Sequence, residues 1–375
     1  METDKGFGKF KYIDLHNWIV DRIRDGTFPY NAKLPSEAAL CEQFNVSRQT
    51  VRNALKALID EGYVASVKGS GSFVQKRFNQ RERKIGVLFT TVRGYICADI
   101  LSGMESVFLP MGYSIQLELS HNRSDNERRF LKAMCASNVS GVIVEATKSN
   151  FPTPNDALFH QLAEQGVPCV FVNSYYQNVP CNAVVWNDRE VAYALTTRLI
   201  RAGHKRIGGI FRFDEMQGAN RFQGFSQALL DNGMEVNENN VCWYCTPDGY
   251  KAYSHRQSNM IDSFVERLET HCSALVCYND IMAGTIINKL RLRGVGIPEQ
   301  VTIVSFDNSD LVQLFGLKDF YSFDHPKDRI GKAAAHMLLE MIDGKRMGCE
   351  ILTVPTPVDV QTDEESVNAS FPTAE

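Results

Sequence analysis

The stretch LPSEAALCEQFNVSRQTVRNALKALIDEGYVASVKGSGSFV, residues 34–74, decides how the N-terminal part of the chain folds. Ser36 precedes a short apolar-faced segment and carries a side-chain oxygen of the kind that caps a helix N-terminus. Ser47 begins residues 47–61 in the same way, and apolar residues recur there every three or four positions. Gly62 then stops the segment. The pattern predicts two consecutive helices, the second strongly amphipathic.

The second of these helices carries polar side chains on the faces that its apolar stripe leaves open. Arg48, Gln49 and Arg52 lie near its N-terminal end, where a recognition helix contacts base edges and phosphates. An earlier helix ends at Gly26, and two short strands, 63–67 and 72–75, flank a glycine-rich tip that carries a lysine. Three helices and a hairpin predict an α+β winged helix.

The order LPSE, VSRxTVRxAL, LxxEGY and GxGxFV resembles the GntR-type DNA-binding domain over about residues 8–76. Many members carry Arg after the Glu of the first box, whereas this chain has Ala38, so one DNA contact is expected to be missing. The resemblance implies binding of double-stranded operator DNA through Ser47, Arg48, Gln49, Thr50, Arg52, Lys68 and Gly69.

Charge is distributed unevenly along the chain. Residues 1–84 hold 15 Lys and Arg against 10 Asp and Glu, a balance of +5, and residues 85–375 hold 25 against 34, a balance of −9. A basic front suits an anionic partner. We expect a winged helix over 1–75, a basic linker over 76–84, an effector-binding domain over 85–362 and a flexible polar tail over 363–375.

Composition narrows the class of protein. The chain has 44% hydrophobic and 22% charged residues, no membrane-spanning apolar run and no secretory h-region, so we expect a cytoplasmic protein without membrane contact. Its ten cysteines are interpreted as reduced core residues. Cys242 and Cys245 have CxxC spacing, but no second CxxC follows, so we expect no metal and no cofactor.

From Lys84 onward, apolar strand-like runs alternate with helical stretches such as 191–199 and 280–290, which predicts α/β architecture with parallel sheets. Two series of four runs predict two doubly wound lobes with a ligand cleft between them. The predicted strands are 85–89, 114–119, 141–144, 169–172, 206–211, 241–245, 274–277 and 301–306.

Polar residues follow these strands: Thr90 and Thr91, Glu145, Asn173, Asn279 and Asp307. Because ligands bind beyond the carboxyl ends of parallel strands, these side chains are candidates for ligand contact, although Asn and Asp there often cap helices, as we expect of Asp280. Amide, carboxylate and Arg groups can bind neighbouring hydroxyls, and aromatic rings stack on a pyranose, so the mixture suits a sugar.

The segments GHKRIGGIF, RFQGF, VCYNDIMA, GIPEQVTIVSFDN and FDHPKDRIGKAAA resemble LacI-type effector domains, which have the type I periplasmic-binding-protein-like fold, over residues 84 to about 362. With the GntR-type front, the chain resembles the arabinose-responsive repressors, which implies a homodimer that L-arabinose releases from its operator. Matching positions imply effector contacts by Tyr95, Glu145, Lys148, Asp188, Arg221, Asn279, Asp307 and His325.

Other functions are weighed against a sugar-released repressor. The same scaffold could sense another sugar or a nucleoside, or activate transcription. An enzyme is disfavoured because no histidine lies in a motif with a nucleophile and GxSxG, Walker A and HExxH motifs are absent. A solute-binding transport component would lack the DNA-binding front.

Overall fold

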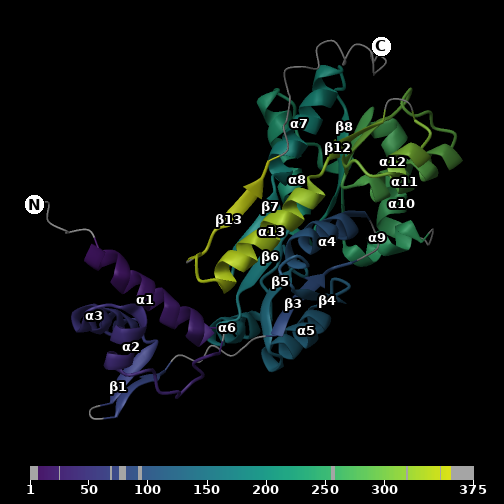
Figure 1. The fold of residues 1–375 in the computed structure, drawn as a ribbon. Helices are drawn as coiled ribbons and strands as arrows, with labels where there is room; N and C mark the ends of the chain where they lie inside the picture. Colours follow the sequence, from purple (N-terminus) through teal and green to yellow (C-terminus); the bar gives the residue numbers. More distant parts are fainter. Residues whose placement is uncertain are drawn as a thin grey trace, which may run out of the picture. The chain divides into compact units, whose positions relative to one another are not determined.

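The computed structural model describes residues 7–24, 26–67, 70–75, 82–91, 95–254, 258–317, 320–346 and 348–355. Residue contacts divide the chain into two compact units, Met1–Glu82 and Arg83–Glu375, each described by itself below (Figure 1). Residues 76–81 of the predicted linker and the whole predicted tail, 363–375, lie outside the described residues. None of the helices among the described residues is long and apolar enough to cross a membrane.

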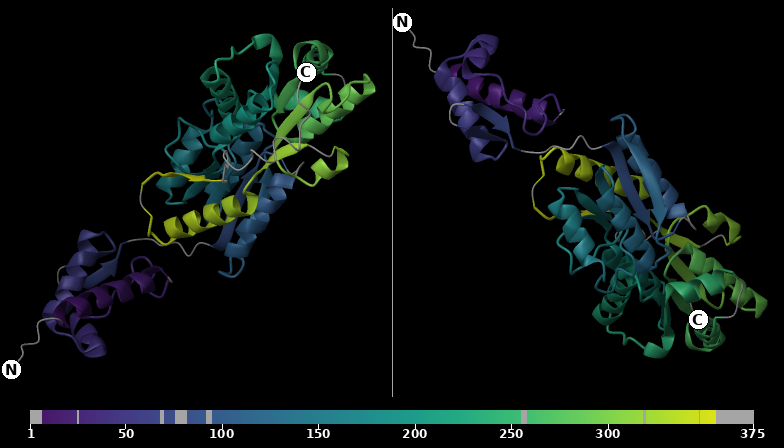
Figure 2. Two further views of the ribbon diagram at one scale, coloured as in Figure 1. Left: turned by 90° about the horizontal axis from the view of Figure 1, so that it is seen from above. Right: turned by 90° about the horizontal axis from the view of Figure 1, so that it is seen from below.

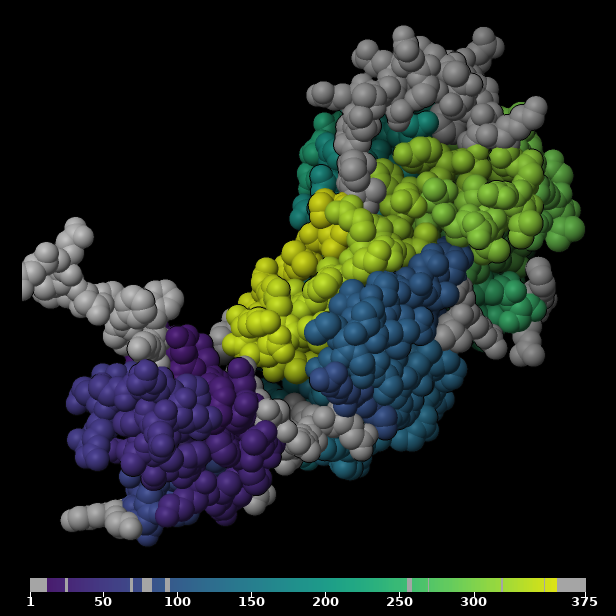
Figure 3. Space-filling view, in the orientation of Figure 1, coloured from purple at the N-terminus to yellow at the C-terminus, as the bar shows by residue number. Residues whose placement is uncertain are grey.

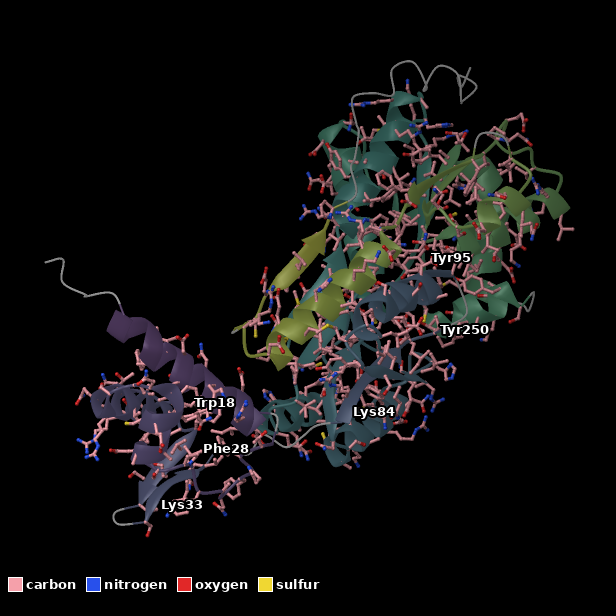
Figure 4. All side chains as sticks on the ribbon, in the orientation of Figure 1. Trp18, Phe28, Lys33, Lys84, Tyr95 and Tyr250 are labelled. Atoms are coloured by element: carbon pink, nitrogen blue, oxygen red, sulfur yellow. The ribbon has the colours of Figure 1, made fainter. Side chains whose placement is uncertain are left out.

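The first unit is the predicted winged helix. Ser36 Oγ accepts from the backbone N–H of Ala39 at 3.2 Å and Ser47 Oγ from that of Thr50 at 3.1 Å, so both predicted caps are confirmed. Trp18 packs edge-on against Phe28 at the side of an apolar core (Figure 4). The elements are α1 (Phe7–Arg24), α2 (Glu37–Phe44), α3 (Arg48–Asp60), β1 (Val64–Val67) and β2 (Gly71–Val74).

The second unit contains two sheets, each covered by helices on both faces (Figure 2). Lobe 1 is built on a six-stranded sheet with the order β13-β7-β6-β5-β3-β4. Its helices α4 and α13 cover one face, and α5 and α6 cover the other. Its elements are β3 (Glu82–Phe89), α4 (Tyr95–Phe108), β4 (Ser114–Leu119), α5 (Ser124–Ala136), β5 (Val139–Val144), α6 (Asp156–Glu164), β6 (Cys169–Val172), β7 (Asn182–Trp186), α13 (Lys327–Ile342) and β13 (Ile351–Val354).

Lobe 2 is built on a five-stranded sheet with the order β12-β11-β10-β8-β9, paired in parallel throughout. Its elements are α7 (Asp188–Arg201), β8 (Ile207–Arg212), α8 (Met216–Asp231), a 3₁₀ turn (Glu238–Asn240), β9 (Val241–Tyr244), α9 (Thr246–Tyr253), α10 (Asn259–His271), β10 (Ala274–Cys277), α11 (Asp280–Leu292), β11 (Thr302–Asp307), α12 (Leu311–Leu314) and β12 (Tyr321–Asp324).

The chain passes between the lobes at two described points. It leaves lobe 1 after β7 and enters α7 of lobe 2, and it returns after β12 into α13. Trp186 ends β7 and His325 follows β12, and their rings meet at 4.5 Å between centroids. The two crossings therefore lie side by side, as expected of a hinge.

Helices α4 and α13 lie against each other on the surface of lobe 1 (Figure 3). Glycine makes this close approach possible. A Cβ atom at Gly331 would lie 2.1 Å from the backbone oxygen of Ile100, and one at Gly103 would lie 2.5 Å from that of Asp328. The return of α13 to lobe 1 thus depends on two glycines at the helix contact.

Candidate functional site

The N-terminal end of α3 carries the predicted DNA-contacting side chains. Arg48, Gln49 and Arg52 are exposed, and Ser47 Oγ lies 2.9 Å from Thr50 Oγ1. Arg52 Nε donates to Glu37 Oε2 of α2 at 3.1 Å, which steadies the guanidinium on the surface. The remaining two predicted residues, Lys68 and Gly69, lie outside the described residues.

A cavity of about 1110 Å³ lies between the lobes of the second unit, beyond the carboxyl ends of their strands. Tyr95 at the start of α4 lines it from lobe 1, and Tyr250 of α9 lines it from lobe 2 (Figure 4). The cavity brings together seven of the eight predicted effector residues: Tyr95, Glu145, Asp188, Arg221, Asn279, Asp307 and His325.

Lys148 is the predicted residue that does not line the cavity. Its side chain is exposed, and its backbone has a φ of 50°. The backbone N–H of Lys148 donates to Asn122 Oδ1 at 2.6 Å. Lys148 therefore contacts the site through its backbone, which is hydrogen-bonded to the cavity-lining Asn122.

Arg221 of α8 is the electrostatic centre of the cavity. Its Nε donates to Asp188 Oδ1 at 2.7 Å, and Nη2 lies 3.8 Å from Asp307 Oδ1. Nη1 donates to the backbone oxygen of Tyr278, and the guanidinium lies 4.2 Å from the centre of the Phe306 ring. Arg221 and Asp188 are only 4% and 3% exposed, so one cation serves two carboxylates away from water.

Asp307 ends β11 with a φ of 100° and is fully buried. Tyr95 Oη donates to its Oδ2 at 2.9 Å, which joins lobe 1 to lobe 2 across the cavity. Burial raises the pKa of Asp307 to about 6, although Arg221 opposes the shift. Burial also holds the pKa of His325 well below its ordinary value, with Arg221 and Lys327 adding to the shift, so the imidazole is neutral.

Glu145 forms a second polar group on lobe 1. Its Oε2 accepts from the backbone N–H and the Oγ1 of Thr90 at 2.7 and 2.6 Å, and its Oε1 accepts from Asn173 Nδ2 at 3.0 Å. Burial raises the pKa of Glu145, and these hydrogen bonds oppose the shift. Polar residues predicted after three different strands thus meet at one carboxylate, since Thr90 follows β3, Glu145 follows β5 and Asn173 follows β6.

The raised pKa of Asp307 predicts a pH dependence of stability. Between pH 3.8, the ordinary pKa of this side chain, and about pH 6, the folded protein binds the proton of the Asp307 carboxyl more tightly than the unfolded chain does. The contribution of Asp307 to the free energy of unfolding therefore falls as pH rises through this window. The free energy of unfolding of Asp307→Asn, relative to that of wild type, should be about 1 kcal/mol higher at pH 7.5 than at pH 5.0. Urea unfolding at both pH values measures it, and an unchanged difference between the proteins would contradict the assignment.

The expectation for Asp280 is wrong in detail. Asn279 is the N-cap of α11, since its Oδ1 accepts from the backbone N–H of Met282 at 2.9 Å. Asp280 is the first helical residue, and its carboxylate accepts hydrogen bonds from three serine hydroxyls instead, those of Ser305, Ser309 and Ser322. A sequence pattern cannot choose between two adjacent residues when both are of types that cap helices.

Further cavity residues were not predicted, among them Arg212, Glu215, Tyr278 and Trp186. Arg212 Nη1 donates to Glu215 Oε1 at 2.6 Å, and Tyr278 Oη donates to Glu215 Oε2 at 2.6 Å, so these three side chains form one buried cluster. Trp186 lies at the hinge. Arg212 directly follows the predicted strand 206–211, so the rule applied to the other strand ends would have found it had it been applied here.

Several cavity-lining side chains have a buried polar atom without a hydrogen-bond partner among the described residues. These atoms are Asn173 Oδ1, Arg212 Nε, Gln217 Oε1, Asp307 Oδ1 and His325 Nδ1. Buried polar groups are costly unless they are satisfied, so the cavity suits a ligand with several hydroxyl groups. Among the residues that the structure describes, no group of three His, Cys, Asp or Glu side chains could hold a metal ion.

Comparison with known proteins matches both units. Residues 12–74 match the model of the gntR family of bacterial regulatory proteins, and residues 196–361 match a periplasmic binding protein-like domain. The chain is 32% identical to the arabinose metabolism transcriptional repressor of Geobacillus stearothermophilus, over 89% of this chain and 91% of that protein. It is 30% identical to the repressor of the same name from Halalkalibacterium halodurans, over 90% of both.

Solved structures agree on the fold. A complex of the transcriptional regulator CelR with cellobiose is similar at a TM-score of 0.62 and 22% identity, over 82% of this chain and 89% of that chain. At this identity the likeness concerns the fold, and it confirms the predicted arrangement of parallel-sheet lobes of the periplasmic-binding-protein type.

Proposed function

The chain belongs to the family of the arabinose metabolism transcriptional repressors, and from this premise we propose that it binds its operator as a homodimer and that L-arabinose, bound between the lobes, releases it. The observation that carries the proposal is the buried cluster of Arg221, Asp188 and Asp307 in a cavity between the lobes. Arginine and carboxylate groups of this kind bind adjacent hydroxyls in pairs.

The DNA-binding half of the proposal rests on the exposed N-terminal end of α3. Arg48, Gln49 and Arg52 can reach base edges and phosphates there, while the opposite side of the helix is buried in the core of the winged helix. One such helix reads only a few base pairs, and a two-fold homodimer would read two half-sites. All seven DNA-contacting positions remain predictions.

The sugar-binding half rests on chemistry that comes from both lobes. Glu145 and Tyr95 belong to lobe 1, and Arg221, Asn279 and Asp307 belong to lobe 2. A ligand that binds both sets stabilises the closed arrangement of the lobes, which is how a sugar would shift the population away from the DNA-binding state. Trp186 offers a ring beside these polar groups, which suits the apolar face of a sugar.

Isothermal titration of the purified protein with L-arabinose tests the proposed ligand. We expect saturable binding, with D-xylose, D-galactose and ribonucleosides weaker. Tighter binding of a comparator would assign a different ligand to the same cavity. If none of these compounds binds, the sugar proposal is overturned.

A hydrogen bond between the lobes predicts a second effect on affinity. Asn122 Nδ2 of lobe 1 donates to Thr246 Oγ1 of lobe 2 at 2.6 Å, and Thr246 does not line the cavity. Thr246→Val should destabilise the closed arrangement without removing a ligand contact. We expect L-arabinose affinity to fall about fivefold, the worth of one hydrogen bond.

The matched control is Thr285→Val. The hydroxyl of Thr285 donates to the backbone oxygen of Ile281 within α11 at 2.9 Å, so its loss leaves the contact between the lobes intact. Equal affinity losses in the two variants, measured by the same titration, would show that the Asn122–Thr246 bond has no part in closure.

A further inference from the structure

Three cysteines lie at or just before the amino ends of three neighbouring strands of lobe 1. In the sheet, β7 lies between β6 and β13. Val170 of β6 pairs with Asn182 of β7, and Ile351 of β13 pairs with Ala183 of β7. Continuing both registers towards the amino ends places Cys169 and Cys349 on either side of Cys181.

Hydrogen bonds hold the segment of Cys349 against that of Cys181. The backbone N–H of Ala183 donates to the backbone oxygen of Glu350 at 2.9 Å. Asn182 completes the connection, since its Nδ2 donates to the backbone oxygen of Gly348 at 3.0 Å and its Oδ1 accepts from the N–H of Glu350 at 3.0 Å. Neighbouring strands lie about 4.8 Å apart, which is within the Cα separation that a disulfide spans.

The three thiols differ in access to solvent. Cys349 is exposed, whereas Cys181 and Cys169 are half-buried. Burial raises the pKa of Cys181 to about 11, and the neighbouring Cys349 adds to the shift. Cys181 is therefore a protonated thiol at neutral pH, and a dissolved oxidant meets Cys349 first.

We propose that Cys349 and Cys181 form a thiol–disulfide site that reacts with hydroperoxides. The Cys349 sulfur takes the terminal oxygen of the hydroperoxide to give a sulfenic acid, and the hydroperoxide is reduced to an alcohol or to water. The Cys181 thiol then attacks that sulfur, an S–S bond forms, and the sulfenic oxygen leaves as water with the thiol proton. Two thiols are oxidised and one peroxide is reduced.

This site is separate from the cavity. The cysteines lie at the amino ends of their strands, whereas the cavity lies beyond the carboxyl ends. The disulfide would fasten β13, an edge strand of the lobe 1 sheet, to β7, the strand that leads into the first crossing between the lobes.

Peptide mapping after oxidation tests the site. The full-length protein is treated with hydrogen peroxide, its remaining thiols are alkylated, and it is digested with trypsin without reduction. Cleavage leaves Cys169 and Cys181 together in peptide 149–189 and Cys349 in peptide 347–375. We expect these two peptides to appear joined, and to separate on reduction.

Variants identify the partner and provide the control. The joined peptides should persist in Cys169→Ser, disappear in Cys349→Ser and disappear in Cys181→Ser. Cys135→Ser, which removes another partly exposed thiol on α5, should behave as wild type. The proposal is overturned if Cys349 stays alkylated, if it is oxidised without joining peptide 149–189, or if the link survives in Cys181→Ser.

Discussion

Arg221→Ala should abolish detectable L-arabinose binding and lower the free energy of unfolding by about 3–5 kcal/mol. Arg221 is the cation beside both Asp188 and Asp307, and all three side chains are buried. Its removal leaves two uncompensated carboxylates and deletes the donors that a sugar would use. A single lost hydrogen bond to a charged group costs about 1.5–3 kcal/mol, so the loss of several places the affinity at least 100-fold lower.

Two measurements separate binding from folding in this variant. Urea unfolding gives the stability loss, and calorimetric titration at a temperature where the variant is folded gives the affinity. Arg221→Ala combined with Asp307→Asn should recover part of the stability, because one buried charge is removed, without recovering binding. Arg346→Ala removes a partly exposed arginine outside the cavity that pairs with Glu340 and Glu350, and it should change neither quantity by much. Wild-type affinity in Arg221→Ala would contradict the assignment.

Arg48→Ala should weaken operator binding by about 10–100-fold while leaving L-arabinose binding unchanged. Arg48 is the first residue of α3 and is exposed, so its truncation removes a DNA contact without disturbing the core of the winged helix. Fluorescence anisotropy with DNA fragments selected by the protein from a random library measures the affinity. The selected sequence should also become less strongly preferred if the lost contact is to a base.

Lys56→Ala provides the matched control for charge. Lys56 is an exposed cation on the same helix, about two turns beyond Arg48. It lies away from the end of the helix that reads bases, so its loss should weaken binding less and equally for all DNA sequences. Equal losses in the two variants would show that α3 contributes charge alone, and the predicted recognition role of Arg48 would be wrong.

The strands that could be predicted from sequence stand out as apolar runs, as in β6 and β10, or as an alternation of polar and apolar residues over six positions, as in β4. The predicted ranges 114–119, 169–172 and 274–277 agree with β4, β6 and β10. Among the described residues, β7, β12 and β13 were missed, although β7 is largely apolar and buried. In β12, Tyr-Ser-Phe-Asp mixes polar and apolar residues, and β13 lies at a sheet edge with its first three residues exposed. The partner of β13 comes from a distant part of the chain, since Ile351 pairs with Ala183.

Residues of the site were predictable for a similar reason. A polar residue directly after a buried strand marks the carboxyl edge of a parallel sheet, which locates Glu145 and Asp307. Pattern alone cannot locate a residue that reaches the cavity from within a helix, and Arg221 was identified only through its resemblance to a known family. Nor does a pattern indicate that Lys148 presents its backbone to the site while its side chain faces solvent.

The most direct test of sugar-controlled repression is the affinity of the full-length protein for its selected DNA with and without saturating L-arabinose, at one fixed salt concentration. We predict that the sugar weakens binding by about 10–100-fold, the range of a typical coupling free energy between two sites. Arg221→Ala should bind the DNA as tightly as wild type, and its DNA affinity should not change when L-arabinose is added. Equal DNA affinity of the wild-type protein in both conditions would contradict the account.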